Sequence, residues 1–188
     1  MDMLRNIVAT VACVAVSSLA QAQSTNPITG TVDAQLVLTS GCTISSGSTS
    51  GTAGTFCTLD FGTQPAYFTG SLNASAAGSG TATPTQVTCS PDLQSVNVTV
   101  DSGKNPNKGV ANGSGTRAMT NGTDFVPYEV YSDSGDTSAY TAGTPLTVPI
   151  AAAGQPFNLP IYGVANKTTP TALSSGTYTD TLNVTLGW

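Results

Sequence analysis

Two stretches of the chain alternate apolar and polar side chains, one near each end. Near the N-terminus, one parity carries only small or apolar residues: Ile28, Gly30, Val32, Ala34, Leu36 and Leu38. Near the C-terminus, apolar residues recur at even positions, with Thr and Asn mostly between them: Tyr178, Leu182, Val184, Leu186 and Trp188. A period of two predicts strands with one buried face. The first stretch would span about 36 Å when fully extended.

Shorter alternating runs, bounded by Gly, Pro, Asn and Asp, recur between these two stretches. They predict strands within residues 56–62, 83–90, 95–103, 125–133, 144–151 and 157–165. No window has a sustained apolar stripe of period 3.6, and the composition is rich in Thr, Ser, Gly, Val and Asn, which favours strands and turns over helices. The chain is therefore predicted to be an all-β sandwich. The Gly-rich and Asn-rich residues 78–84 and 110–124 are expected to be loops.

The first 22 residues have the pattern of a secretory signal peptide. A weakly basic head precedes an apolar run, and the run ends at "AQA", residues 20–22, which is a small-x-small cleavage site. The apolar run is too short to be a permanent membrane anchor. We expect residues 1–22 to be removed, which leaves about 166 residues, enough for one domain with its own core.

Charge and the absence of histidine argue against several functions. The chain has ten Asp or Glu, five Lys or Arg and no His, for a net charge of −5. Without a basic patch, neither nucleic acid nor an anionic membrane is an expected partner. Without histidine, Ser-His and Cys-His nucleophile pairs are impossible, and no carboxylate pair has the setting of a glycosidase site. We expect no enzyme activity and no cofactor.

One short acidic sequence has some of the residues of a calcium loop. "DSGD", residues 133–136, lacks the further alternating oxygen ligands of a calcium loop, so a plain turn is predicted and no metal is expected.

Three cysteines follow the predicted signal peptide, namely Cys42, Cys57 and Cys89. In an exported protein two of them should form a disulfide and the third should stay unpaired. On the chain-entropy model, closing the loop of about 48 residues from Cys42 to Cys89 contributes about 4 kcal/mol, and the loop of about 16 residues to Cys57 about 3 kcal/mol. This difference does not choose the pair. No cation lies near Cys57 in sequence to lower its pKa, which favours a structural thiol over a reactive one.

Seven short motifs, taken in order, resemble the spore coat protein U domain, a family that includes the pilins of archaic, Csu-type chaperone–usher pili. No motif is specific alone, but their order and spacing span nearly the whole mature chain. They are GCTI (41–44), LDFG (59–62), VTCS (87–90), RAM (117–119), PYEVYSD (127–133), IYG (161–163) and GTYTDTLNVTL (176–186).

The resemblance implies an incomplete immunoglobulin-like β-sandwich, residues 41–188, completed by a donor strand from a neighbouring subunit. Residues 23–40 would be the donor-strand extension, with Ile28, Gly30, Val32, Ala34, Leu36 and Leu38 facing inward. The edge of the sandwich that accepts a donor strand would be the C-terminal strand, with Tyr178, Leu182, Val184, Leu186 and Trp188. The family pattern also implies a disulfide between Cys42 and Cys89 and has no counterpart for Cys57.

The partners that the resemblance implies are identical or related pilin subunits, a periplasmic chaperone and an outer-membrane usher. Export through the periplasm would end in a surface pilus used in adhesion and biofilm formation. One domain with a donor strand favours a main shaft subunit over a tip adhesin, and a minor adaptor subunit remains an alternative. A different alternative is a secreted coat or carbohydrate-binding module that fills its groove with its own N-terminal strand.

Physical reasoning agrees with assembly in trans. An exposed apolar edge strand is an aggregation hazard that soluble proteins usually cover or charge. Residues 181–188, "TLNVTLGW", contain neither a charge nor a proline. A strand supplied by the next molecule would cover this edge, and a head-to-tail contact that does not close generates a filament.

Overall fold

The computed structural model describes residues 28–44, 55–77 and 84–188, so the predicted signal peptide lies outside the described residues. The chain divides into two units, Met1–Val37 and Leu38–Trp188. In the described part of the first unit, residues 28–37, there is no strand and every residue is exposed. A strand was predicted here, but an extended segment becomes a strand only when a partner satisfies its backbone.

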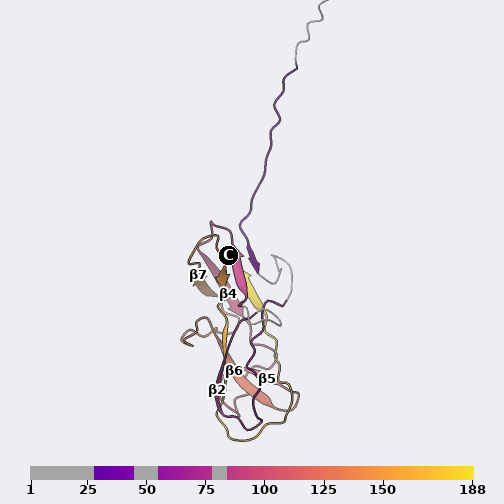
Figure 1. Ribbon diagram of the computed structural model, residues 1–188, viewed down its shortest axis with the longest axis vertical. Coiled ribbons are helices and arrows are strands. Elements are labelled where there is room, and N and C mark those ends of the chain that lie inside the picture. The colour runs from indigo at the N-terminus through magenta and orange to yellow at the C-terminus, as the bar shows by residue number, and fades with distance from the viewer. Residues whose placement is uncertain (1–27, 45–54, 78–83) are drawn as a thin grey trace, which may run out of the picture. The chain divides into compact units, whose positions relative to one another are not determined.

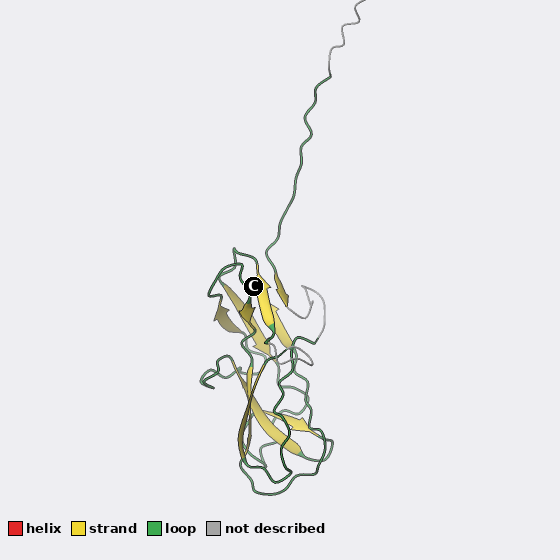
Figure 2. Cartoon of the chain, viewed as in Figure 1, coloured by secondary structure: helices red, strands yellow, loops and turns green. Residues whose placement is uncertain are grey.

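The second unit contains only strands, turns and loops in its described part (Figure 2). Its strands are β1 (Cys42–Ile44), β2 (Gly70–Ser75), β3 (Gln86–Cys89), β4 (Ser95–Val100), β5 (Arg117–Thr120), β6 (Phe125–Tyr131), β7 (Leu146–Pro149), β8 (Phe157–Asn158), β9 (Tyr162–Lys167) and β10 (Val184–Gly187). The all-β prediction is confirmed. Among the residues described there is no helix with the length and apolar character needed to cross a membrane.

The strands form three antiparallel sheets, with the orders β1-β3-β8, β10-β4-β7 and β2-β9-β6-β5 (Figure 1). Strand β4 shows the predicted alternation most clearly, because Val96, Val98 and Val100 are fully buried while Asn97 is exposed. Side chains from all three sheets belong to one hydrophobic core. Antiparallel sheets that share a core in this way are the architecture of an immunoglobulin-like sandwich.

Two sequence predictions for the middle of the chain are wrong. Residues 56–62 form no strand, and only Thr58 makes an isolated bridge, with Ala77. Residues 110–124, predicted to be a loop, contain β5, which pairs with β6 along its whole length. Strand β5 was missed because it starts with a charged residue, Arg117, which the fold buries completely.

The predicted strand in residues 157–165 is two strands, β8 and β9, which belong to different sheets. The break falls at Leu159–Ile161. Pro160 has no N–H to donate to a ladder, so a chain that changes sheets at this residue gives up few ladder hydrogen bonds.

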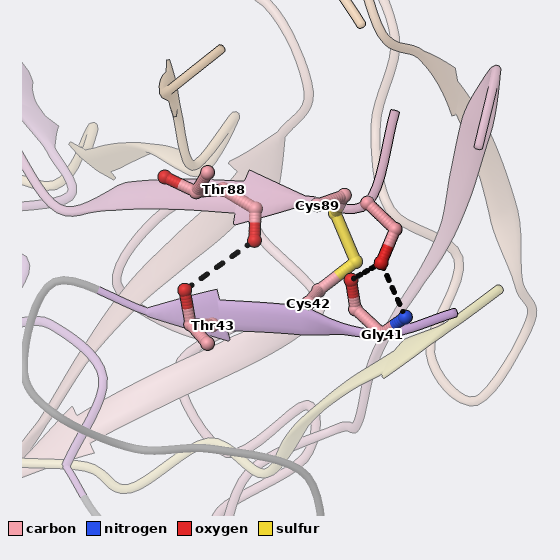
Figure 3. The surroundings of a disulfide bond; sticks show 6 residues. Gly41, Cys42, Thr43, Thr88 and Cys89 are labelled. Atoms are coloured by element: carbon pink, nitrogen blue, oxygen red, sulfur yellow. Dashed lines mark hydrogen bonds between the residues drawn. A yellow bond between two sulfur atoms is a disulfide. The ribbon is translucent and has the colours of Figure 1, made fainter. Parts of the chain in front are cut away.

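A disulfide joins Cys42 of β1 to Cys89 of β3, which are cross-strand partners in the ladder (Figure 3). Beside it, the Ser90 hydroxyl accepts a hydrogen bond from the Gly41 N–H at 2.9 Å and donates one to the Gly41 carbonyl at 3.1 Å. This is the pair that the family resemblance implies, and Cys57 is free.

Peptide mapping without reduction is therefore expected to give a peptide that links Cys42 to Cys89, with Cys57 recovered as a thiol. The two paired residues face each other across β1 and β3, and bridging to Cys57 would need both strands to separate. A peptide that links Cys42 to Cys57 would contradict this pairing.

Candidate functional site: a groove along the C-terminal segment

Two adjoining hollows of about 760 Å³ and 510 Å³ follow the C-terminal segment. They share several lining residues: Leu59, Asp60, Phe61, Met119 and Tyr178. Together they form one continuous hollow, which we call the groove. Residues Leu173–Thr185 line it along its length, and we call this segment the rim.

The groove opens onto the hydrophobic core. Its lining includes residues that belong to the core itself, among them Tyr128, Ile161 and Ala165. Next to these lie apolar side chains that the fold only half covers, such as Phe61 and Met119. Side chains of the core and half-buried apolar side chains thus border an open hollow, which favours an interaction site.

Side chains of the predicted C-terminal strand alternate as expected, although only β10 is a regular strand. Tyr178, Leu182, Val184 and Leu186 are half-buried against the core, and the odd-numbered residues from Thr179 to Thr185 are exposed. Trp188 follows β10 and is 44% exposed. The even-numbered parity therefore faces the core, and each of these side chains remains partly exposed.

One edge of β10 lacks a strand in the described part of the chain, because β4 pairs with the other edge. Further along the rim, Thr179 exchanges two backbone hydrogen bonds with Thr120, each 3.0 Å long, and the Asn183 carbonyl accepts one from the Asp101 N–H at 3.1 Å. Successive residues of an extended chain direct their backbone groups to opposite sides. The N–H and C=O groups of Asp180 and Leu182 thus point toward the open edge.

Two carboxylates hold the rim between its bridge to β5 and its ladder with β4. The first is Asp180, whose Oδ1 accepts the Lys104 N–H at 2.9 Å and whose Oδ2 accepts the Tyr128 hydroxyl at 2.9 Å. Burial, and then the negative charge of Asp180, raise the pKa of Tyr128 well above its usual range. The hydroxyl therefore stays protonated and donates to the rim.

The second carboxylate is Asp101, directly after β4. Its Oδ1 accepts the N–H groups of Asn183 and Gly103, both at 3.0 Å, and its Oδ2 accepts the Asn183 amide at 2.6 Å. Burial alone would raise the pKa of Asp101, but these hydrogen bonds outweigh it and the pKa lies below its usual value. Asp101 is consequently charged at neutral pH and binds the rim as a carboxylate.

A buried ion pair lies below this contact. The Arg117 guanidinium is fully buried and pairs with the Glu129 carboxylate. It also donates from Nε to the Asp101 carbonyl at 2.9 Å and from Nη2 to the Tyr140 carbonyl at 3.0 Å. Arg117 thereby fixes the backbone of Asp101, the residue that holds the rim. The motif RAM, in which Arg117 occurs, did not predict this role.

Cys57 lines the wider hollow and is half-buried. Burial raises its pKa, so the thiol is protonated at neutral pH, in keeping with the structural role predicted for it. No cluster of three or more metal-binding side chains occurs among the residues that the structure describes. The predicted turn at Asp133 uses its carboxylate to accept the N–H groups of Gly135, Thr137 and Ser138.

The residues predicted to face inward in the donor strand are all exposed to solvent in the structure. Ile28, Val32 and Leu36 are 101%, 94% and 79% exposed, and Leu38, at the start of the second unit, is 83% exposed. Gly30 and Ala34 are exposed as well. An apolar face of this length in water is unfavourable unless something covers it.

An all-β sandwich with an open groove beside its core is the class of protein that these features define. The model of the Spore Coat Protein U domain matches residues 28–185, and the chain belongs to this family. Comparison with curated proteins gives no match.

Among solved structures the chain is similar to the CsuC–CsuE chaperone–tip adhesion subunit pre-assembly complex from archaic chaperone–usher Csu pili of Acinetobacter baumannii. The identity is 18% and the TM-score is 0.46. The match covers 80% of this chain and 40% of that chain, so this chain spans well under half the length of its structural neighbour.

Proposed function

We propose that this protein is a pilin-type subunit of a chaperone–usher pilus, and that residues 23–40 of one copy fill the groove of the next. The observation that carries the proposal is the groove itself, which runs beside the core along an edge of β10 that has no strand in the described part of the chain. Family membership supports the same reading.

The open position is where a further strand belongs in this architecture. In an immunoglobulin sandwich, one sheet contains three neighbouring strands, C, F and G. Strands β4 and β10 pair as two such neighbours, and the next position beyond β10 is vacant in the described part of the chain. An added strand there would satisfy the backbone groups along the rim, the mode of recognition known as β-strand addition.

The N-terminal segment has the length and chemistry for this position. Extended, Ile28 to Leu38 spans about 36 Å, and the rim from Leu173 to Thr185 measures at most about 43 Å. Each large apolar side chain that becomes fully buried contributes about 1.5–3 kcal/mol. Because the segment carries all its large apolar side chains except Val37 on one parity, it can bury them in the groove and leave Thr29, Thr31 and Asp33 in water.

This arrangement defines the partners. A second copy or a related subunit supplies the donor, and because each copy both gives and receives, the contacts continue into a filament. Before assembly the groove needs a temporary cover, which a periplasmic chaperone would supply, and an outer-membrane usher would pass the subunits to the cell surface. The proposed role there is that of a shaft subunit in adhesion and biofilm formation.

The free thiol of Cys57 provides a direct test, because it lines the groove. A chain lacking Thr25–Thr39 should stay soluble with its chaperone but not polymerise. After release from the chaperone, a synthetic peptide of residues 25–39 is expected to slow maleimide labelling of Cys57 at least tenfold, because a bound strand excludes reagent from the groove. Labelling is followed by mass spectrometry.

A peptide with Val32→Asp and Leu36→Asp serves as the matched control and should give no protection. Equal labelling rates with and without the unmodified peptide would contradict the proposed occupant. A stable monomer formed by the full chain, with Cys57 already protected, would instead support a self-complemented module.

A further inference from the structure

We infer that Asp180 and Asp101 are positioning residues for the groove: their carboxylates hold the rim at the place where it passes from one sheet to the other, and so keep the receiving edge in register for the incoming strand. This inference rests on the proposed function, since it concerns how the groove is held ready.

The rim is attached to different sheets at its two ends. Thr179 bridges to Thr120 of β5, in the sheet β2-β9-β6-β5, whereas β10 pairs with β4 in the sheet β10-β4-β7. Residues 180–183 between these attachments have no ladder. An extended segment without a ladder is free to shift or twist, and a shift of one residue would exchange the side chains that face the groove.

Hydrogen bonds to the two carboxylates take the place of the missing ladder, and they interlock. Asp180 reaches from the rim to the Lys104 N–H and the Tyr128 hydroxyl. Asp101 reaches in the opposite direction, from the end of β4 to the N–H and the side-chain amide of Asn183. Anchors at both ends of the unladdered stretch fix its position along the chain and its rotation.

The residues around Asp180 hold its hydrogen-bond donors in fixed positions. Tyr128 is 3% exposed and packs on Phe61 with a ring-centroid distance of 6.1 Å, so its hydroxyl cannot follow a moving rim. A side chain at Gly103 would collide with the Asp180 carboxylate, and Gly103 has a φ of +68°, a conformation that suits glycine. The turn that presents the Lys104 N–H is therefore shaped around Asp180.

The inference is tested in the full chain carrying Val32→Asp, which should receive a donor strand but not give one and so remains monomeric. The probe is a fluorescent synthetic peptide of residues 25–39, and its affinity is measured by anisotropy. Adding Asp180→Ala is expected to weaken binding about tenfold, since two hydrogen bonds to a charged group are lost. Asp101→Ala should weaken binding at least as much, because it removes three.

Asp180→Asn is expected to restore affinity close to that of the parent chain. Its carbonyl oxygen can accept the Lys104 N–H, and its amide can donate to the Tyr128 hydroxyl, which is able to accept instead. A role limited to negative charge would not be rescued in this way. Asp133→Ala is the matched control, because Asp133 also accepts several backbone N–H groups but lines neither hollow, and it should leave peptide affinity unchanged.

Hydrogen exchange of residues 179–184 without peptide gives a second measurement. Asp180→Ala should speed exchange there while the Cys42–Cys89 disulfide still forms. Unchanged rim exchange, unchanged peptide affinity in a folded Asp180→Ala chain, or an equal loss with Asp133→Ala would overturn the inference. If the parent chain bound no peptide, the proposed function would fail, and the exchange measurement would still decide whether these carboxylates hold the rim.

Discussion

Val32→Asp or Leu36→Asp is expected to abolish or severely reduce surface fibres while the subunit still accumulates with its chaperone. Both side chains lie on the parity proposed to enter the neighbouring groove, where core residues such as Tyr128 and Ile161 form part of the lining. Either change would bury a carboxylate that has no partner there, at a cost of several kcal/mol. The measurement is the amount of surface fibre relative to total periplasmic subunit, in cells that also express the chaperone and the usher.

Thr31→Asp and Gln35→Glu are the matched controls, because they place the same charge on the opposite parity. Side chains alternate strictly along a strand, so these two positions remain in water when the other set is buried. Both variants should assemble nearly as well as the unmodified chain. Equal loss in the two sets, or loss only at Thr31 and Gln35, would show that the donor strand has been assigned in the wrong register.

The alternating pattern predicts which side chains are buried in two parts of the chain. In β4 the sequence Ser-Val-Asn-Val-Thr-Val sets three valines on one parity, and all three are buried. Along the C-terminal segment, the even parity from Tyr178 to Leu186 faces the core even where no regular strand forms. Both results depend only on neighbouring residues, which a single sequence contains.

Local sequence patterns do not predict the parts of the structure that long-range contacts decide. Residues 56–62 have an alternating pattern, yet they line the groove and form no ladder beyond the isolated bridge of Thr58 to Ala77. No sequence pattern marked the carboxylates of Asp101 and Asp180, since Asn183 lies 82 residues from Asp101 and Lys104 lies 76 from Asp180. No local signal connects such pairs.

Arg117→Met is expected to lower the free energy of unfolding by about 3–5 kcal/mol, the usual cost of removing one partner of a buried ion pair. It would leave the Glu129 carboxylate without its cation and would remove the donors to the carbonyls of Asp101 and Tyr140. Urea unfolding of the chain, followed by circular dichroism, gives the change.

Two further variants separate the causes of this loss. Lys104→Met removes an exposed cation and should change stability by less than about 0.5 kcal/mol, as surface substitutions usually do. Adding Glu129→Gln to Arg117→Met should recover part of the loss, because the uncompensated charge disappears while the side chain can still accept from Thr116. If Arg117→Met were no more harmful than Lys104→Met, the guanidinium would not hold the backbone beneath the rim, and the support of the groove would have to come from the Asp101 and Asp180 carboxylates alone.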